Sequence, residues 1–304
     1  MKSGRHHIFN AEIRKESPMR SYAYLIRLLF ASLSMLLLTA CVTERPAPAQ
    51  TLRLYVFNCG SIEVLDVSVF HPGIGKGERK MLTDSCYLVV HPNGSLLWDA
   101  GLPDGLVNTP EGKIAYNVLI FRVAKPLAAQ LHEIGQGPET VGYLGISHMH
   151  GDHIGNVALF PRATLLIQKE EHDAAFGPDA SKFGFDPAQY ASLRSNPVKK
   201  LEGDHDVFGD GAVVIKRTLG HTPGHQALYV KLPKTGNILL SGDLVHFTDN
   251  WVHKRVPGFN FDKERSIKTM QEVEDFLKTN QATLWIQHDL EQNAGIQHAP
   301  AYYE

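Results

Sequence analysis

Residues 148–153 read His-Met-His-Gly-Asp-His and carry three imidazoles and one carboxylate within six positions. The apolar run before them predicts a strand that ends in a turn. His148 and His150 then point to the same side, because side chains alternate along a strand, and Asp152 and His153 follow on the turn. Imidazole nitrogens and carboxylate oxygens are ligands of a borderline divalent ion such as Zn²⁺. The segment therefore predicts a metal site.

Four ligands from one turn cannot enclose two metal ions, and further candidates lie downstream. His221 and His225 flank a Thr-Pro-Gly turn, and Asp243 and His288 each come shortly after an apolar run. In α/β sheets, binding sites collect at the carboxyl ends of strands. We therefore expect these segments to meet the 148–153 turn at one edge of a sheet.

The elements that must position these residues are short strands and a few helices. Apolar spacing predicts helices over 126–134 and 262–278, with Asp262 as the cap of the second, and a partly helical excursion over 177–200. Asn93-Gly94 is a hairpin signal, and a second hairpin is expected around 234–236. The pattern indicates a mixed α/β class. Strands are predicted over 52–58, 84–91, 95–99, 141–147, 164–168, 213–218, 226–232, 237–241 and 283–286.

Composition narrows the class of protein. The 304 residues include 30 basic and 32 acidic side chains, for a formal charge of −2, whereas a nucleic-acid-binding protein normally shows a basic excess. We therefore expect no nucleic-acid partner. With 43% hydrophobic and 20% charged residues, the chain resembles an ordinary globular enzyme. Three cysteines are too few for a thiolate zinc cluster or a disulfide scaffold.

The N-terminus is typical of an export signal. Residues 28–40 are uncharged and too few to span a bilayer, which takes about 20 residues, but they fit the apolar part of a leader. They end in Leu-Thr-Ala before Cys41, which resembles a lipobox with Cys41 as the lipidated residue. We expect an export signal over 1–40 with a start at either Met1 or Met19, a Pro- and Ala-rich tether over 41–50, and a hydrolase domain over 51–304. The expected location is the outer membrane facing the periplasm, with a soluble exported protein as the alternative if Cys41 is not lipidated.

The motif His-x-His-x-Asp-His, followed downstream by His, Asp and His, resembles the metallo-β-lactamase superfamily over roughly residues 51–303. The resemblance implies an αββα sandwich with a dinuclear site, most simply two Zn²⁺, at one edge. By the pattern of that family, three residues hold each metal and one aspartate bridges the two. These are His148, His150 and His225 for the first metal, Asp152, His153 and His288 for the second, and Asp243 for the bridge.

The resemblance also gives roles to Asp99 and His221. Asp99 matches an early Asp-x-Gly turn of the superfamily, which supports the site without ligating a metal, and His221 is expected to be structural or to support a ligand. Cys59 and Cys86 could pair in an oxidising compartment. Two buried thiols are the favoured expectation.

Within the superfamily, several segments resemble N-acyl homoserine lactonases. They are 52–55, 86–88, 224–228, 257–259 and 287–292. One position departs from that pattern, because those lactonases usually carry a tyrosine three residues after the bridging aspartate and this sequence has His246. Imidazole can donate a similar hydrogen bond with different reach. The departure puts the substrate in doubt more than the chemistry.

The resemblance implies a hydrolase acting on a small-molecule lactone or ester. A hydroxide shared by two ions would attack the carbonyl, Asp152 would return a proton to the leaving oxygen, and His246 would contact the substrate. Phe70 and Ile74 are expected to line a groove for an acyl chain. The oligomeric state is open, with a homodimer among the options.

Four alternatives stay open. A periplasmic β-lactamase shares the compartment, but those enzymes carry a non-acidic residue where Asp243 stands. A glyoxalase II-like thioesterase shares the ligand set, although its thioesters belong mainly to the cytoplasm. A ribonuclease of this fold is disfavoured by net charge and by export. A non-catalytic lipoprotein that keeps its metals for structure is the alternative outside the enzymes.

Overall fold

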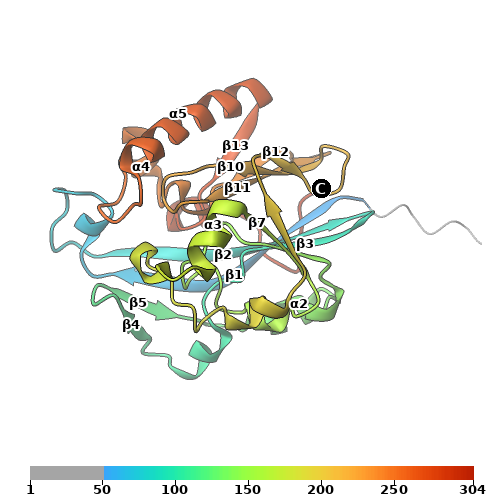
Figure 1. The fold of residues 1–304 in the computed structure, drawn as a ribbon, viewed down its shortest axis with the longest axis horizontal. Coiled ribbons are helices and arrows are strands. Elements are labelled where there is room, and N and C mark those ends of the chain that lie inside the picture. The colour runs from blue at the N-terminus through green and yellow to red at the C-terminus, as the bar shows by residue number, and fades with distance from the viewer. Residues whose placement is uncertain (1–50) are drawn as a thin grey trace, which may run out of the picture. The chain divides into compact units, whose positions relative to one another are not determined.

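The computed structural model describes residues 51–304, which form two β-sheets packed face to face with helices on their outer faces (Figure 1). The expected signal and tether, including Cys41, lie outside the described residues. Apolar side chains of both sheets meet in one buried cluster that includes Val56, Trp98, Ile215 and Leu240. The four layers are the αββα sandwich that the family resemblance implied.

The first sheet has eight strands in the order β4-β5-β1-β2-β3-β6-β7-β8. Its β2–β3 hairpin turns at Asn93-Gly94 as predicted, with His91 opposite Gly94, and its β6 runs parallel to both β3 and β7. The strands are β1 (Arg53–Val64), β2 (Lys80–His91), β3 (Gly94–Trp98), β4 (Lys113–Ala115), β5 (Leu119–Arg122), β6 (Tyr143–Gly145), β7 (Thr164–Gln168) and β8 (Val198–Leu201).

The second sheet has five strands in the order β13-β12-β11-β10-β9. The predicted hairpin between β11 and β12 is present, with Leu232 opposite Gly236, and β13 pairs with β12 in parallel. The strands are β9 (His205–Asp206), β10 (Val213–Arg217), β11 (Gln226–Leu232), β12 (Gly236–Leu240) and β13 (Ala282–Trp285).

Helix α5 covers the outer face of the second sheet. Met270 and Val273 of this helix pack against Tyr229 and Leu239 in a buried cluster, and the Asp262 carboxylate accepts a hydrogen bond from the Arg265 N–H at 2.8 Å, as expected for a cap. On the first sheet, α2 and α3 pack on the opposite face. The helices are α2 (Leu127–Glu133), α3 (Lys169–Phe176), α4 (Thr248–His253), α5 (Lys263–Asn280) and α6 (Leu290–Asn293), and the predicted excursion holds 3-10 turns at Ala180–Phe183 and Ala191–Ser195.

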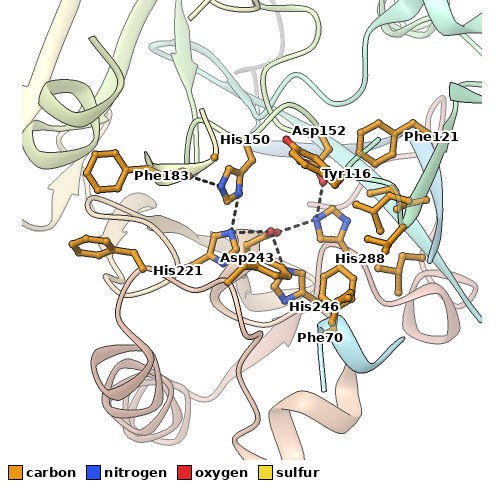
Figure 2. A pocket seen from close by; sticks show the side chains of 18 of the residues that line it. Phe70, Tyr116, Phe121, His150, Asp152, Phe183, His221, Asp243, His246 and His288 are labelled. Carbon is orange, nitrogen blue, oxygen red and sulfur yellow. Dashed lines mark hydrogen bonds and ion pairs between the residues drawn. The ribbon is translucent and has the colours of Figure 1, made fainter. Parts of the chain in front are cut away.

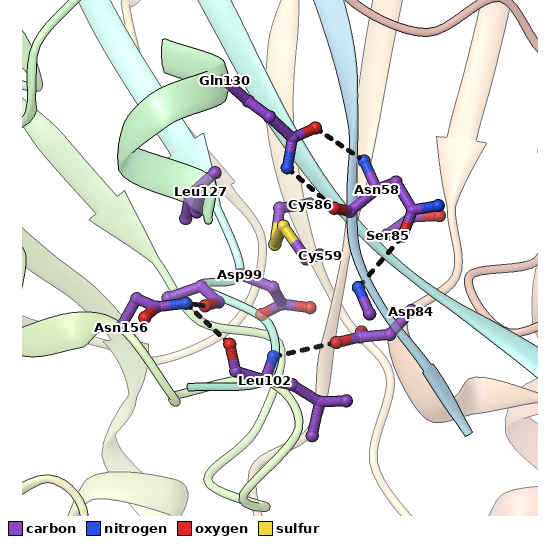
Figure 3. Close-up of a disulfide and its surroundings, with 12 residues drawn as sticks. Asn58, Cys59, Asp84, Ser85, Cys86, Asp99, Leu102, Leu127, Gln130 and Asn156 are labelled. Carbon is purple, nitrogen blue, oxygen red and sulfur yellow. Dashed lines mark hydrogen bonds between the residues drawn. A yellow bond between two sulfur atoms is a disulfide. The ribbon is translucent and has the colours of Figure 1, made fainter. Parts of the chain in front are cut away.

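Cys59 and Cys86 form a disulfide with a Cα–Cα distance of 5.8 Å (Figure 3). The expectation of two free thiols was therefore wrong. Cys59 occupies a bulge between the β1–β2 pairs Asn58–Ser85 and Gly60–Asp84, and this register brings its side chain beside Cys86. A spacing of 27 residues in the sequence does not reveal that register.

Among the described helices, none combines the length and the apolar character that a membrane crossing requires.

Candidate metal centre

The candidate ligands lie on four loops at one edge of the sandwich. The 148–153 turn follows β6 of the first sheet, whereas His221 follows β10, Asp243 follows β12 and His288 follows β13, all of the second sheet. The β6, β12 and β13 segments run parallel to neighbouring strands, so their carboxyl ends reach the same edge. The site is therefore built at the seam between the two sheets.

A first group of side chains converges on the side of the pocket toward Phe183 (Figure 2). The nitrogens His148 Nε2 and His150 Nδ1 are 2.8 Å apart, and His221 Nε2 lies 3.2 Å and 3.0 Å from them. A carboxylate oxygen of Asp243 lies 3.3 Å from His221 Nε2. We call these four residues the first group; one donor atom from each lies within 4.8 Å of the others.

A second group consists of Asp152, His153 and His288, whose donor atoms also lie within 4.8 Å of one another. The two Nε2 atoms of the histidines are 3.4 Å apart. Asp152 Oδ2 lies 3.9 Å from His288 Nε2. The Asp152 side chain is 17% exposed while the two imidazoles are buried, so its carboxylate faces the pocket.

Asp243 lies between the two groups. Its Oδ2 faces the first group, 3.3 Å from His221 Nε2, and its Oδ1 faces the second, 3.2 Å from His153 Nε2 and 2.9 Å from His288 Nε2. The side chain is buried, and Oδ1 makes no well-aligned hydrogen bond among the described residues. This carboxylate is placed to serve both groups at once.

The imidazoles fit a cation because each directs a lone pair inward. The outer nitrogen of His150 donates to the Phe183 carbonyl at 3.0 Å, that of His288 donates to the Thr83 carbonyl at 2.8 Å, and that of His153 faces Asp99 Oδ2 at 2.9 Å. Such outer bonds fix the tautomer of a ligating histidine. The inner nitrogens are then acceptors that lie about hydrogen-bond distance from one another, so their lone pairs repel. A cation shared between them would remove this repulsion.

His221, and not His225, completes the first group. The Asp243 N–H donates to His225 Nε2 at 2.9 Å, and His225 Nδ1 donates to the Thr218 carbonyl at 2.9 Å. Both nitrogens are thus engaged, and burial lowers the pKa of His225 to about 4, which keeps the ring neutral. This corrects the sequence expectation that gave the position to His225 and a supporting role to His221.

Asp99 supports the second group, as the resemblance implied. Its Oδ1 accepts from the Ser147 N–H at 2.6 Å and its Oδ2 accepts from Gln287 Nε2 at 3.0 Å, in addition to its contact with His153. The carboxylate therefore ties the 148–153 turn to the segment that carries His288.

The electrostatics of the site favour positive charge beside Asp243. Burial disfavours the charged form of His288, but the neighbouring Asp243 carboxylate outweighs it and raises the pKa of His288 to about 9. Burial and the nearby His153 together hold the pKa of His148 well below its usual value. The Asp243 carboxylate thus favours positive charge on the groups that face it.

The two groups open into a pocket of about 380 Å³ (Figure 2). Phe70 lines it, as expected, whereas Ile74 does not: its side chain is 44% exposed and lies outside the lining. The expectation for Ile74 was wrong because the loop after η1 (Val67–Val69) turns it toward solvent. Sequence reasoning missed several lining residues, which lie on segments without an apolar pattern. They are Tyr116, Phe183, Phe259 and Phe261.

His246 lies at the floor of this pocket, three residues after Asp243. Its Nε2 is 3.0 Å from Asp243 Oδ2, and its ring packs edge-on against Phe70 with 4.7 Å between centroids. The side chain is buried, and Nδ1 has no hydrogen-bond partner among the described residues. A buried, unpaired imidazole nitrogen in a pocket wall is available to a bound molecule.

Comparison with known proteins agrees with this geometry. The family model of the metallo-beta-lactamase superfamily matches residues 82–278. An N-acyl homoserine lactonase AttM of Agrobacterium fabrum is 29% identical over 263 residues, which cover 83% of this chain and 98% of that protein. The N-acyl homoserine lactonase AiiA of Bacillus thuringiensis subsp. kurstaki is 26% identical over 256 residues, 82% of this chain and 98% of that one.

A solved structure of an N-acyl homoserine lactone hydrolase, with the product N-hexanoyl-L-homoserine bound at its catalytic metal center, superposes with a TM-score of 0.72 at 25% identity, covering 83% of this chain and 100% of the other. The chain therefore belongs to the metallo-β-lactamase superfamily, and it is a metal-dependent hydrolase of the αββα fold.

Proposed function

We propose that the protein is a dinuclear-metal lactonase that opens the ring of N-acyl homoserine lactones or of related lactones and esters. The observation that carries this proposal is the placement of Asp243, whose two oxygens face two separate groups of imidazoles. A carboxylate in this position suits two ions rather than one. The similarity to proteins named N-acyl homoserine lactonases over more than four fifths of the chain supports the substrate class.

The donor set suits two Zn²⁺ ions. His148, His150 and His221 would hold one ion, and Asp152, His153 and His288 the other, with Asp243 between them. Nitrogen and oxygen donors without thiolates are typical of zinc sites in hydrolases. When bound, such ions lower the pKa of water toward 7 and polarise a carbonyl.

The chain itself supplies orientation and a proton. Asp152 is the most exposed residue of the second group, so its carboxyl can exchange protons with solvent and return one to the ring oxygen as that oxygen leaves. The His246 Nε2–H, which faces Asp243 Oδ2 at 3.0 Å, would donate to the substrate carbonyl oxygen when ions occupy that carboxylate. Burial strengthens such a hydrogen bond because water does not compete for the donor.

The apolar part of the pocket suits an acyl chain. Ile62, Leu82 and Phe121 line it together with Phe70, with which they share one buried apolar cluster. Phe121 lies on the side of His288 (Figure 2), and the Phe70 ring packs against His246. An acyl chain bound in this apolar part would leave the polar lactone ring over the two groups of candidate metal ligands, since polar and apolar surfaces of the pocket are separated.

The proposal is tested by measuring turnover and metal content together. The purified protein is assayed with short- and long-chain N-acyl homoserine lactones, an aryl ester and a cephalosporin. We expect lactone opening and about two metal ions per chain, and we expect Asp243→Ala to lose both. Asp275→Ala, an exposed carboxylate on α5, is the control. Full lactone turnover by metal-free Asp243→Ala, or hydrolysis of the cephalosporin alone, contradicts the proposal.

We further propose that the protein is exported and anchored by lipid on Cys41. The disulfide between Cys59 and Cys86 supports an oxidising compartment, because disulfides rarely persist in the cytosol. Cell fractionation should find the wild type with outer membranes and the Cys41→Ser variant in the soluble periplasmic fraction. Wild type recovered from the cytosol contradicts this placement.

A further inference from the structure

Glu171, in the first turn of α3, is a fully buried carboxylate outside both candidate metal groups. It accepts three hydrogen bonds from two loops that are far apart in the sequence. Its Oε1 accepts from the Met149 N–H at 2.9 Å. Its Oε2 accepts from the Thr222 hydroxyl at 2.8 Å and from the Gly224 N–H at 2.8 Å.

The donors flank the histidines of the first group. Met149 lies between His148 and His150, and Thr222 directly follows His221. We infer that Glu171 is a positioning residue of the metal centre, which fixes the 148–150 turn against the 221–224 turn so that their imidazoles converge on one ion. The inference rests on the metal centre proposed above.

The packing around Glu171 is tight on the side of the 221–224 turn. A Cβ added at Gly224 would come within 2.3 Å of the Glu171 nitrogen, so the 221–224 turn lies directly against the start of α3. Among the described residues, no lysine, arginine or histidine forms an ion pair with Glu171. Burial raises the pKa of this carboxyl to about 7, and the three donors oppose that rise. A buried acid retained without a cation is destabilising, which indicates a role beyond packing.

The second group is held by other contacts, from Asp99 to His153 and from the Thr83 carbonyl to His288. Loss of Glu171 should therefore weaken one ion and spare the other. If an imidazole is displaced by a few tenths of an ångström, the protein stays folded but binds the ion more weakly. Variants of groups that orient ligands typically lose about 10–100-fold in metal affinity.

The test is a metal titration of Glu171→Gln against a competing chelator, with Zn²⁺ as the probe. Glutamine keeps the shape but presents an NH₂ group to at least one of the two backbone donors. We expect about 10–100-fold weaker binding of one ion, unchanged binding of the other, and a matching fall in kcat. Glu170→Gln, on the same helix and paired at the surface with Arg217, is the matched control.

Two further variants assign the affected ion. Asp99→Asn should weaken the other ion, and the double variant Glu171→Gln/Asp99→Asn should bind neither at a Zn²⁺ concentration that saturates the wild type. Thr222→Val removes one donor of three and should show a smaller loss confined to the same ion as Glu171→Gln.

Equal affinities in Glu171→Gln and Glu170→Gln overturn the inference, and so does an equal loss of both ions. If Glu171→Gln does not fold, Thr222→Val decides: loss of affinity for one ion supports the inference and unchanged affinities overturn it. A wild type that binds no Zn²⁺ refutes the proposed function instead, so the two failures are distinguishable.

Discussion

Two histidines four residues apart, His221 and His225, take different roles because His221 keeps one nitrogen for the first group, whereas both nitrogens of His225 are engaged. His221 donates through Nδ1 toward Asn260 Oδ1 at 3.0 Å and directs Nε2 into the first group. His225 uses Nε2 to accept the Asp243 N–H, so it orients the carboxylate that serves both groups. Spacing alone could not separate them, since both flank the same turn and both are buried.

The assignment predicts opposite results for two substitutions. His221→Ala should lose about one metal ion per chain and nearly all lactone turnover. His225→Gln should keep both ions and lose activity only in part, because an amide can replace one of the two hydrogen bonds of the ring. Metal analysis of the two purified variants checks this. Loss of metal from His225→Gln with retention in His221→Ala would restore the original sequence assignment.

His246 can be tested by a substitution that leaves all seven candidate ligands in place. His246→Phe removes the donor while keeping an aromatic ring against Phe70, and we expect kcat/KM for lactones to fall about 100-fold, the size of loss seen when one donor to a developing oxyanion is removed. Metal content should not change. His253→Phe, an exposed histidine of α4, is the control, and an equal loss in both variants contradicts the role of His246.

Asp84 gives a pH dependence with a definite sign. It is fully buried and accepts one hydrogen bond, from the Leu102 N–H, and burial raises its pKa to about 8 from 3.8. The native state therefore holds a proton that the unfolded chain releases between these values. Its contribution to stability is fully present below pH 3.8 and is lost as the pH rises through about 8.

Asp84→Asn should remove this loss. The free energy of unfolding of the wild type should fall relative to that of the variant between pH 5 and pH 8, by up to about 1.4 kcal/mol per pH unit. Denaturant unfolding of both proteins at each pH measures the difference, in which the shared pH dependence of metal binding cancels. Parallel curves would show that Asp84 titrates normally.

At the scale of elements, the β1–β2 pair connects the disulfide to the metal centre. Gly101 has φ +57°, and a Cβ there would come within 2.3 Å of Cys59 Cβ, so the turn that contains Asp99 packs directly on the disulfide (Figure 3). Only glycine fits this contact and this backbone conformation without strain. The disulfide thus lies beneath the residue that orients His153.

Removing the disulfide should lower stability and loosen this turn. Replacing Cys59 and Cys86 together by serine should lower the free energy of unfolding by about 2–4 kcal/mol, mainly through the greater freedom of the unfolded chain. Denaturant unfolding with and without a reductant measures it. The reductant should destabilise the wild type and leave the variant unchanged.

The sequence predicted those strands and turns that are specified by a local pattern of their own residues. Short apolar runs bounded by Gly and Pro identified β7, β10 and β11, and Asn93-Gly94 specified the β2–β3 turn. It did not predict β4 and β5, which form a short hairpin with exposed Ile114 and Tyr116, because half-exposed strands lack the alternation of buried ones. The bulge that pairs the cysteines depends on strand register, which a single sequence does not display.

At the scale of the whole molecule, the site connects the two sheets. The first sheet supplies the 148–153 turn, and the second supplies His221, Asp243 and His288. Ions bound there would stabilise the native state by mass action, because the unfolded chain does not hold these groups together. We therefore expect the centre to contribute to the stability of the sandwich as well as to chemistry.

Metal removal should lower the melting temperature. Dialysis against a chelator is expected to reduce it by several degrees, since occupancy at 100 times Kd is worth about 2.7 kcal/mol, and added Zn²⁺ should restore it. Asp243→Ala should show neither change. A chelator that abolishes activity without moving the melting temperature contradicts a metal centre shared by both sheets.

Because Asp243 belongs to one sheet and the 148–153 turn to the other, neither half can assemble the centre alone. A complete centre would then form only after the two halves have docked. Catalytic competence would then be a late event, and a chain halted with its halves apart would stay inert even where the metal is plentiful.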